Sequence, residues 1–185
     1  MTANDSGAEE ASASRGERLA IVEEHIQQEN QHDLDGIMAT FGEDAWYDNE
    51  PVGEHHEGRD SVRAYYDDLL QALPDFHIEI HQRHVTDEHV ILEVTISGTH
   101  EGNWRGLPGT GREVEWDTCA VFAFDDQNKL AGERIYYDRA SLLRQLGIFH
   151  DPERGIGQIL TPLTHPVTFA RALARNIRTG RTIHT

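Results

Sequence analysis

Two stretches of alternating side chains decide the fold: residues 90–100 read VILEVTISGTH and residues 114–124 read VEWDTCAVFAF. Apolar and polar side chains alternate in both, which is the pattern of a strand with one face on a core and one toward solvent. The side chains expected to face inward are Val90, Leu92, Val94, Ile96, Gly98 and His100 from the first stretch, and Trp116, Thr118, Ala120 and Phe122 from the second.

Each stretch has a partner across a short polar turn. His77–Val85 precedes Val90–His100 across residues 86–89, and Leu130–Tyr137 follows Val114–Phe124 across residues 125–128. Alternating runs separated by four polar residues are typical of β-hairpins. The sequence therefore predicts an antiparallel sheet built from two long hairpins.

Upstream of the sheet the apolar period changes to that of helices. Apolar residues at 19, 22 and 26 predict one helix, a second is expected to open at Asp33, and Asp60 is expected to cap a third that ends before Pro74. Ala45–Asn49 is predicted to be a short strand and residues 51–58 a loop. Helices followed by long strands predict an α+β fold, with a bent sheet wrapped over the helices as a cone that has a pocket at its open end.

The chain divides into three predicted parts. Residues 1–14 lack apolar periodicity and are predicted to be a disordered leader, and residues 15–148 are predicted to form the α+β domain, which closes with a short helix at Ser141–Leu146. Residues 149–185 are predicted to be an extension with a basic amphipathic helix from Val167 to Ile177. Its expected apolar face holds Phe169, Leu173 and Ile177, and its expected basic face holds Arg171, Arg175 and Arg178.

Composition excludes several classes of protein. No apolar run approaches the ~20 residues of a membrane helix, and the first 16 residues have neither the basic start nor the apolar stretch of a secretory signal. We therefore expect a soluble, cytoplasmic protein that does not bind membranes. The net charge of −17 argues against nucleic acid as a partner. A single cysteine, Cys119, allows no internal disulfide.

The basic residues are 15 arginines and one lysine, Lys129. An acidic surface nearly free of lysine fits a chain that stays hydrated in strong salt, which indicates a halophile; an acidic surface encoded by a GC-rich genome is the alternative. Residues 1–150 carry a net charge of −20 and residues 151–185 carry +3. The basic helix is therefore expected to pack on its own or a partner's acidic domain.

Four motifs along residues 17–148 resemble one superfamily. They are the helix motif of residues 32–38 (HDLDGIM), Pro51-Val52-Gly53, the glycine-rich stretches at 98–102 and 106–111, and residues 133–138 (ERIYYD) running into 142–147 (LLRQLG). The chain is similar to the nuclear-transport-factor-2-like superfamily, which has a cystatin-like fold, and within it to the SnoaL-like polyketide cyclases and ketosteroid isomerases. This resemblance implies a cone-shaped domain, and it also implies a homodimer.

The resemblance assigns candidate roles residue by residue. An acid before Pro-Val-Gly acts as the base in ketosteroid isomerases, and that position is Glu50. The isomerase oxyanion donors fall at His25 and Ala120, so one donor is changed and the other is absent, which argues against steroid isomerase activity. The cyclases use an acid on the last strand, for which Glu133 is the first candidate and Asp138 the second.

The chemistry expected of such residues is proton transfer. A carboxylate in an apolar pocket has a raised pKa and can take and return a proton near neutral pH. Glu50 and Glu133 are the proton-transfer candidates, with His25 and His100 as polar partners. The aromatic residues expected to bind substrate are Trp46, Trp104, Trp116 and Tyr137. Each of these residues also has a structural interpretation: the acids as solvated or ion-paired groups, the histidines as hydrogen-bonding groups and the aromatic residues as core.

The predicted function is a cyclase or isomerase that needs no cofactor or metal and moves a proton next to a carbonyl of a small, largely apolar ligand, polyketide-like or terpenoid-like. A non-catalytic small-molecule binder or structural dimer of the same fold is the alternative, and the altered oxyanion positions favour it. A metal bound at residues 54–57 (EHHE) is a less favoured interpretation. Residues 106–112 mimic the glycine spacing of a phosphate-binding loop but lack its lysine and its following helix.

Overall fold

The computed structural model describes residues 3–151 and 155–179 of the chain, without the side chains of residues 3–13, 169, 172, 173 and 176–179. Residues 1–146 form one unit and residues 147–185 a second. In the described residues no helix is both long and apolar enough to span a membrane.

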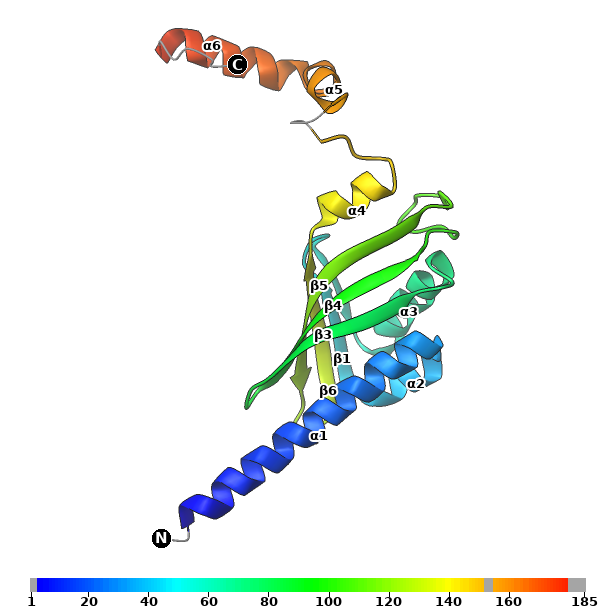
Figure 1. Cartoon of the computed structure of the whole chain (residues 1–185), viewed down its shortest axis with the longest axis vertical. Helices are drawn as coiled ribbons and strands as arrows, with labels where there is room; N and C mark the ends of the chain where they lie inside the picture. The colour runs from blue at the N-terminus through cyan, green and yellow to red at the C-terminus, as the bar shows by residue number, and fades with distance from the viewer. Residues whose placement is uncertain (1–2, 152–154, 180–185) are drawn as a thin grey trace. The chain divides into compact units, whose positions relative to one another are not determined.

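The first unit combines four helices with a six-stranded sheet (Figure 1). In chain order the elements are α1 (Ala3–Gln31), α2 (Leu34–Thr40), β1 (Phe41–Asn49), β2 (Glu54–Glu57), α3 (Arg59–Ala72), β3 (His77–Val85), β4 (His89–Thr99), β5 (Glu113–Phe124), β6 (Leu130–Tyr137) and α4 (Arg139–Gln145). The order of strands across the sheet is β2-β1-β6-β5-β4-β3. The two predicted hairpins, β3–β4 and β5–β6, are confirmed within a residue at each end.

The sheet is mixed, whereas the sequence predicted an antiparallel one. β1 pairs with β6 in parallel, and every other pairing is antiparallel. Register shifts interrupt β1 between Phe41 and Trp46 and β3 between Ile80 and Gln82. Such bulges bend strands, and the bent sheet curves around α1 and α3 (Figure 1).

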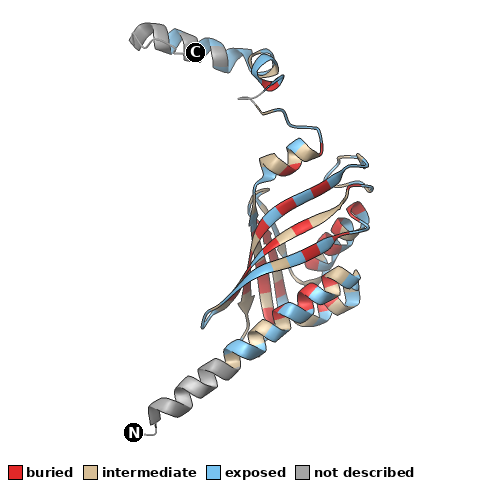
Figure 2. Cartoon of the chain, in the orientation of Figure 1, coloured by how far each residue is buried: buried red, intermediate tan, exposed pale blue. Residues whose placement is uncertain are grey.

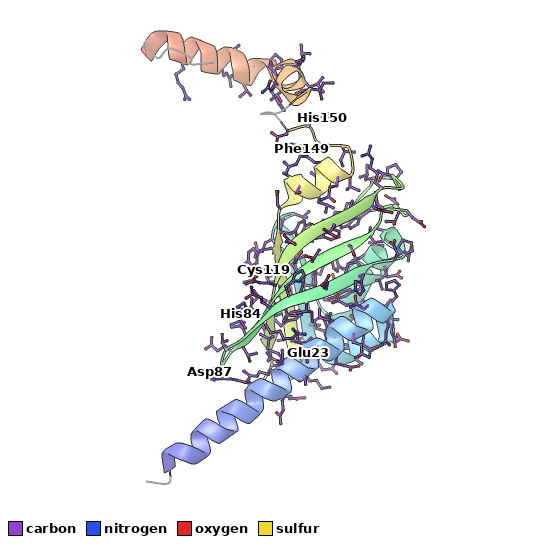
Figure 3. The ribbon with its side chains drawn as sticks, viewed as in Figure 1. Glu23, His84, Asp87, Cys119, Phe149 and His150 are labelled. Atoms are coloured by element: carbon purple, nitrogen blue, oxygen red, sulfur yellow. The ribbon has the colours of Figure 1, made fainter. Side chains whose placement is uncertain are left out.

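The core lies between the concave face of the sheet and these helices. The predicted inward side chains are buried: Val90, Leu92, Val94 and Ile96 on β4, and Trp116, Thr118, Ala120 and Phe122 on β5. Figure 2 shows the resulting alternation of buried and exposed residues along the strands. The other face is more open; Cys119, labelled in Figure 3, lies between Thr118 and Ala120 in sequence and is only partly buried.

Helix α1 begins at Ala3, within the predicted leader of residues 1–14. Two local expectations need correction. The predicted loop of residues 51–58 contains β2, which pairs with β1. Helix α3 begins at Arg59 with Gly58 as its N-cap, so Asp60 lies within the first turn and is not the cap.

The second unit contains α5 (Gly157–Thr164) and α6 (Pro166–Thr179). Helix α6 covers the predicted basic helix of residues 167–177, and α5 was not predicted. Arg171 is exposed, while the apolar side chains of the predicted amphipathic face, Phe169, Leu173 and Ile177, lie outside the described residues, as does that of Arg178. Four apolar side chains around α5 are exposed: Ile156, Ile159, Leu163 and Val167.

Candidate functional site

A cavity lies between the sheet and the helices of the first unit. Its walls are mostly apolar and aromatic, with Ile26 from α1, Leu69 from α3 and Ile135 from β6 among the aliphatic residues. Four polar residues also line it, namely Glu29, Asn49, Thr118 and Glu133. A few polar groups in an apolar cavity are typical of a small-molecule site.

Two of these polar residues are carboxylic acids from different elements. Glu29 lies on α1 and Glu133 on β6, and both residues are only 4% exposed. His25, one turn before Glu29, is completely buried behind them, with its Nε2 3.6 Å from Glu133 Oε2 and 3.9 Å from Glu29 Oε1. In the described part of the chain, neither carboxylate forms an ion pair with an arginine or lysine.

Tyr66 of α3 connects the histidine to one of the acids. Its hydroxyl lies 2.8 Å from Glu133 Oε2, to which it donates, and 3.1 Å from His25 Nε2. On the other side of the ring, His25 Nδ1 lies 2.8 Å from Thr40 Oγ1. The cluster therefore draws its residues from α1, α2, α3 and β6.

Burial changes the acidity of this cluster. It raises the pKa of Glu29 well above the usual value of a glutamate, and the nearby Glu133 raises it further, while the proximity of Tyr66 partly offsets both effects. Burial likewise raises the pKa of the Tyr66 hydroxyl, with Glu133 adding to the effect. Glu29 therefore favours the protonated form, and a protonated acid can donate a hydrogen bond or a proton to a ligand.

Several polar atoms in the cavity wall have no hydrogen-bond partner. They are Glu29 Oε2, Asn49 Oδ1, Trp116 Nε1 and Thr118 Oγ1. Because a buried polar atom without a partner costs about 1–3 kcal/mol, a ligand that bonds to these atoms recovers that free energy. The unpaired set contains an indole N–H and a hydroxyl, which can both donate to a carbonyl oxygen.

Aromatic rings form one side of the cavity. Trp104, Trp116 and Tyr137 follow one another, with ring centroids 6.4 and 6.3 Å apart. The next residue, Arg105, lies over the Trp104 ring at 5.2 Å and forms a salt bridge with Glu54 of β2. This salt bridge ties the loop that carries Trp104 to β2, the strand at one edge of the sheet.

Among the residues proposed from sequence, four line the cavity: Glu133, Trp104, Trp116 and Tyr137. The lining does not include His25, which lies behind the carboxylates and bonds to Thr40 and Tyr66. It does not include His100 either. His100 Nδ1 bonds to the backbone and hydroxyl of Thr110, so this ring holds the glycine-rich loop, and burial lowers its pKa.

The structure corrects the placement of Glu50 and Trp46. Tyr47 and Asn49 of β1 face the cavity, so Trp46 faces the other side, where Arg134 covers its ring at 5.4 Å. Strand β1 ends at Asn49, and the half-exposed Glu50 carboxylate pairs with Arg134 at 3.2 Å instead of entering the cavity.

Asp138 also lies outside the cavity. It is the N-cap of α4, and its carboxylate accepts hydrogen bonds from the backbone N–H groups of Ala140 and Ser141 at 2.9 and 3.2 Å. Its side chain is 64% exposed. Ala120, at the second oxyanion position, lines the cavity but offers no donor.

Sequence analysis missed Glu29 and Tyr66. Glu29 follows Val22 and Ile26 on the buried stripe of α1 at helical spacing, so an acid on an apolar stripe was the available signal. Tyr66 lies within the apolar pattern of α3, where a tyrosine cannot be told from an ordinary core residue by spacing alone. Asn49 was expected only as the end of a strand.

The same cluster contains the donor types that bind a metal ion. One ligand atom from each of His25, Glu29 and Glu133 lies within 4.8 Å of the others. However, the Tyr66 hydroxyl bonds both to His25 Nε2 and to Glu133 Oε2, the atoms that a metal would need. The arrangement therefore fits a hydrogen-bonded proton-transfer network better than a preformed metal site.

Comparison with known proteins identifies the family. A family model for the SnoaL-like polyketide cyclases matches residues 20–146, and the chain belongs to this family. No curated protein matches the sequence.

Solved structures share the fold. AclR from Streptomyces galilaeus is 26% identical, with a TM-score of 0.64 over 74% of this chain and 89% of its own. SalBIII, an epoxide hydrolase/cyclase-like enzyme of pyran ring formation in the polyether salinomycin, is 24% identical, with a TM-score of 0.58 over 67% and 92%. A protein with a ketosteroid isomerase-like fold from Catenulispora acidiphila is 17% identical, with a TM-score of 0.59 over 70% and 93%.

Proposed function

We propose that the protein is a cofactor-independent cyclase or isomerase that moves a proton next to a carbonyl of a small, largely apolar substrate, polyketide-like or terpenoid-like. The observation that carries the proposal is that two buried carboxylic acids, Glu29 and Glu133, face one apolar cavity. Membership of the SnoaL-like polyketide cyclase family supports it.

The two acids have different surroundings and so take different roles. Glu133 faces the cavity and accepts a hydrogen bond from Tyr66 that orients its carboxylate, so it takes the role of the base. Glu29 has an unpartnered oxygen and a raised pKa, so it is the protonated acid that donates to the developing oxyanion. Two acids whose environments separate their protonation states are a recurrent basis of acid–base catalysis.

The cavity wall defines the substrate expected. Its aromatic side, formed by Trp104, Trp116 and Tyr137, favours a flat or cyclic apolar body. Asn49 Oδ1 is unpaired and can accept a hydrogen bond from a hydroxyl group of the substrate, and the unpaired Thr118 hydroxyl can donate to a carbonyl oxygen or accept from a hydroxyl group. A carbonyl compound with an apolar ring system meets both requirements.

The proposal is tested with a panel of polycyclic ketones, steroids and terpenoid ketones. Each compound is first screened by thermal shift in potassium chloride, because a ligand that binds only the folded state raises the melting temperature. Compounds that bind are then incubated with the protein in D₂O, and NMR follows deuterium incorporation next to the carbonyl. This exchange reports proton abstraction even where the complete reaction is unknown.

We expect exchange with the wild-type protein and a loss of about 10²–10⁴-fold in Glu133→Gln, as for removal of a general base. Glu24→Gln is the control for the same chemical change, because Glu24 is an exposed glutamate that does not line the cavity. Binding without exchange would instead support the non-catalytic binder of the same fold, and no binding by any compound would refute the proposed substrate class.

The homodimer implied by the family resemblance is part of this proposal. Size-exclusion chromatography with light scattering tests it: a mass near twice the 20.9 kDa of the chain supports a dimer, and a mass near 20.9 kDa refutes it.

A further inference from the structure

Thr40, at the end of α2, sets the direction of the hydrogen bonds around His25. Its hydroxyl donates to the carbonyl oxygen of Ile37 at 2.7 Å, and its Oγ1 lies 2.8 Å from His25 Nδ1. A hydroxyl has one hydrogen to donate. Because that hydrogen goes to Ile37, the hydrogen between Thr40 and His25 has to come from the ring, so Nδ1 carries it.

With Nδ1 protonated, the other nitrogen of His25 faces Tyr66. The Tyr66 hydroxyl also has one hydrogen and two neighbours, His25 Nε2 at 3.1 Å and Glu133 Oε2 at 2.8 Å. When Tyr66 donates to Glu133, Nε2 must carry a hydrogen to avoid two opposed lone pairs. When Tyr66 donates to Nε2, Glu133 must be protonated for the same reason.

Both arrangements contain the same number of protons. In one, a positively charged His25 accompanies an ionised Glu133; in the other, both residues are neutral. We propose that Thr40, His25, Tyr66 and Glu133 form a proton relay in which Thr40 is the positioning residue, and one proton moves between His25 Nε2 and Glu133 through the Tyr66 hydroxyl.

The transfer balances at each atom. The Nε2–H proton passes to the Tyr66 oxygen as the Tyr66 hydroxyl proton passes to Glu133 Oε2, and the reverse movement restores the first state. The net charge of the cluster stays the same. Resting on the proposed function, the relay lets Glu133 present a base to the substrate in one step and an acid in the next.

The surroundings of His25 favour a shared proton. The titratable groups that face the ring are Glu29, Tyr66 and Glu133, and its remaining neighbours include Phe41 and Phe122, whose rings pack edge-on at 5.1 and 5.9 Å. No part of the His25 side chain reaches solvent. A charge that stays within the cluster avoids the cost of an isolated buried charge.

The relay is tested without any ligand by long-range ¹H–¹⁵N NMR of the folded protein, with the ring nitrogens of His25 assigned through bonds from its own backbone. We expect Nδ1 to carry a hydrogen at every pH at which the protein is folded, with Nε2 as the nitrogen whose signal reports the moving proton. A neutral ring with its hydrogen on Nε2 and none on Nδ1 would overturn the proposal.

Two substitutions at Thr40 separate positioning from folding. Thr40→Ser keeps the hydroxyl and should keep the wild-type spectrum, whereas Thr40→Val removes the acceptor and should move the hydrogen from Nδ1 to Nε2. An unchanged Nδ1–H in folded Thr40→Val would refute the role of Thr40. Should the valine variant not fold, the wild-type and serine spectra still decide the tautomer.

Deuterium exchange then connects the relay to function. Thr40→Val should exchange a bound ketone about tenfold more slowly than wild type, as expected for loss of one orienting hydrogen bond, and Thr40→Ser should restore the rate. The predicted tautomer without any exchange by wild type would sustain the relay and refute the proposed function. If deuterium exchange requires Glu133 but NMR places the His25 hydrogen on Nε2 and not on Nδ1, the proposed function is sustained and the relay is refuted.

Discussion

The protonated state of Glu29 predicts how the stability of the protein depends on pH: the contribution of Glu29 to the free energy of unfolding should fall as the pH rises. Its pKa is raised in the folded protein, by burial first and by Glu133 second. An unfolded glutamate has a pKa of about 4.3. Above that pH the unfolded chain has lost a proton that the folded chain still holds, so the free energy of unfolding falls as the pH rises.

The size of the effect follows from one proton. Glu29 contributes its full stability below about pH 4, and the contribution declines by up to about 1.4 kcal/mol for each pH unit until the pH passes the folded pKa. Glu29→Gln is neutral in both states and lacks this decline. The free energy of unfolding of Glu29→Gln, relative to that of wild type, should therefore rise by up to about 1.4 kcal/mol per pH unit. For a chain of this length, that corresponds to a relative rise of about 3–6 °C in melting temperature per pH unit.

Paired thermal melts of wild type and Glu29→Gln from pH 4 to pH 8, at fixed potassium chloride concentration, provide the assay. The unpartnered amide of the glutamine adds a constant offset, but the slope of the difference against pH isolates Glu29, because all other titrating groups are common to both proteins. Glu24→Gln, on the exposed face of α1, should give a flat difference. A flat or falling difference for Glu29→Gln would refute the protonated state of Glu29 and with it the assigned acid.

Three further outcomes follow from other contacts. Asp138→Ala removes two N-cap hydrogen bonds from α4 and should lower the free energy of unfolding by about 1 kcal/mol in urea titrations, without changing deuterium exchange; a loss of exchange would return Asp138 to the site. Gly132→Ala would place its Cβ 2.1 Å from the Trp46 ring, so urea titrations should show a loss of about 1–3 kcal/mol. Asp75 accepts hydrogen bonds from the backbone N–H and the hydroxyl of Thr99, and these bonds lower the pKa of Asp75. Wild type should therefore be more stable than Asp75→Asn near neutral pH, and thermal melts should show this difference shrinking as the pH falls below 4.

The alternation of apolar and polar residues predicted the strands and their inward faces, because a period of two can be recognised from neighbouring residues alone. The inward placement of Trp116 needed only the alternation of β5, and the structure buries it in the cavity wall. The parallel pairing of β1 with β6 was not predictable in this way. It joins segments more than 80 residues apart, and no local turn chemistry specifies it.

The site was predictable only in part. Glu133 was assigned from the family resemblance, and its place on β6 in the cavity wall agrees with that assignment. Glu50 was assigned from the same resemblance, but it follows the predicted end of β1 at Asn49, and its carboxylate pairs with Arg134 outside the cavity. Glu29 was readable in principle, since an acid in the row of Val22 and Ile26 contradicts the expectation for a buried helix face.

The electrostatic balance of the cluster explains how two acids can occupy an apolar cavity. Two ionised carboxylates without a cation would be costly to bury, and no arginine or lysine of the described residues pairs with Glu29 or Glu133. The raised pKa of Glu29 removes one of the charges. The proton shared between His25 and Glu133 compensates the charge of Glu133: on His25 it makes the ring positive beside an ionised Glu133, and on Glu133 it leaves both residues neutral. An acid–base pair that keeps its total charge constant can thus change roles during a reaction without unfolding the cavity that contains it.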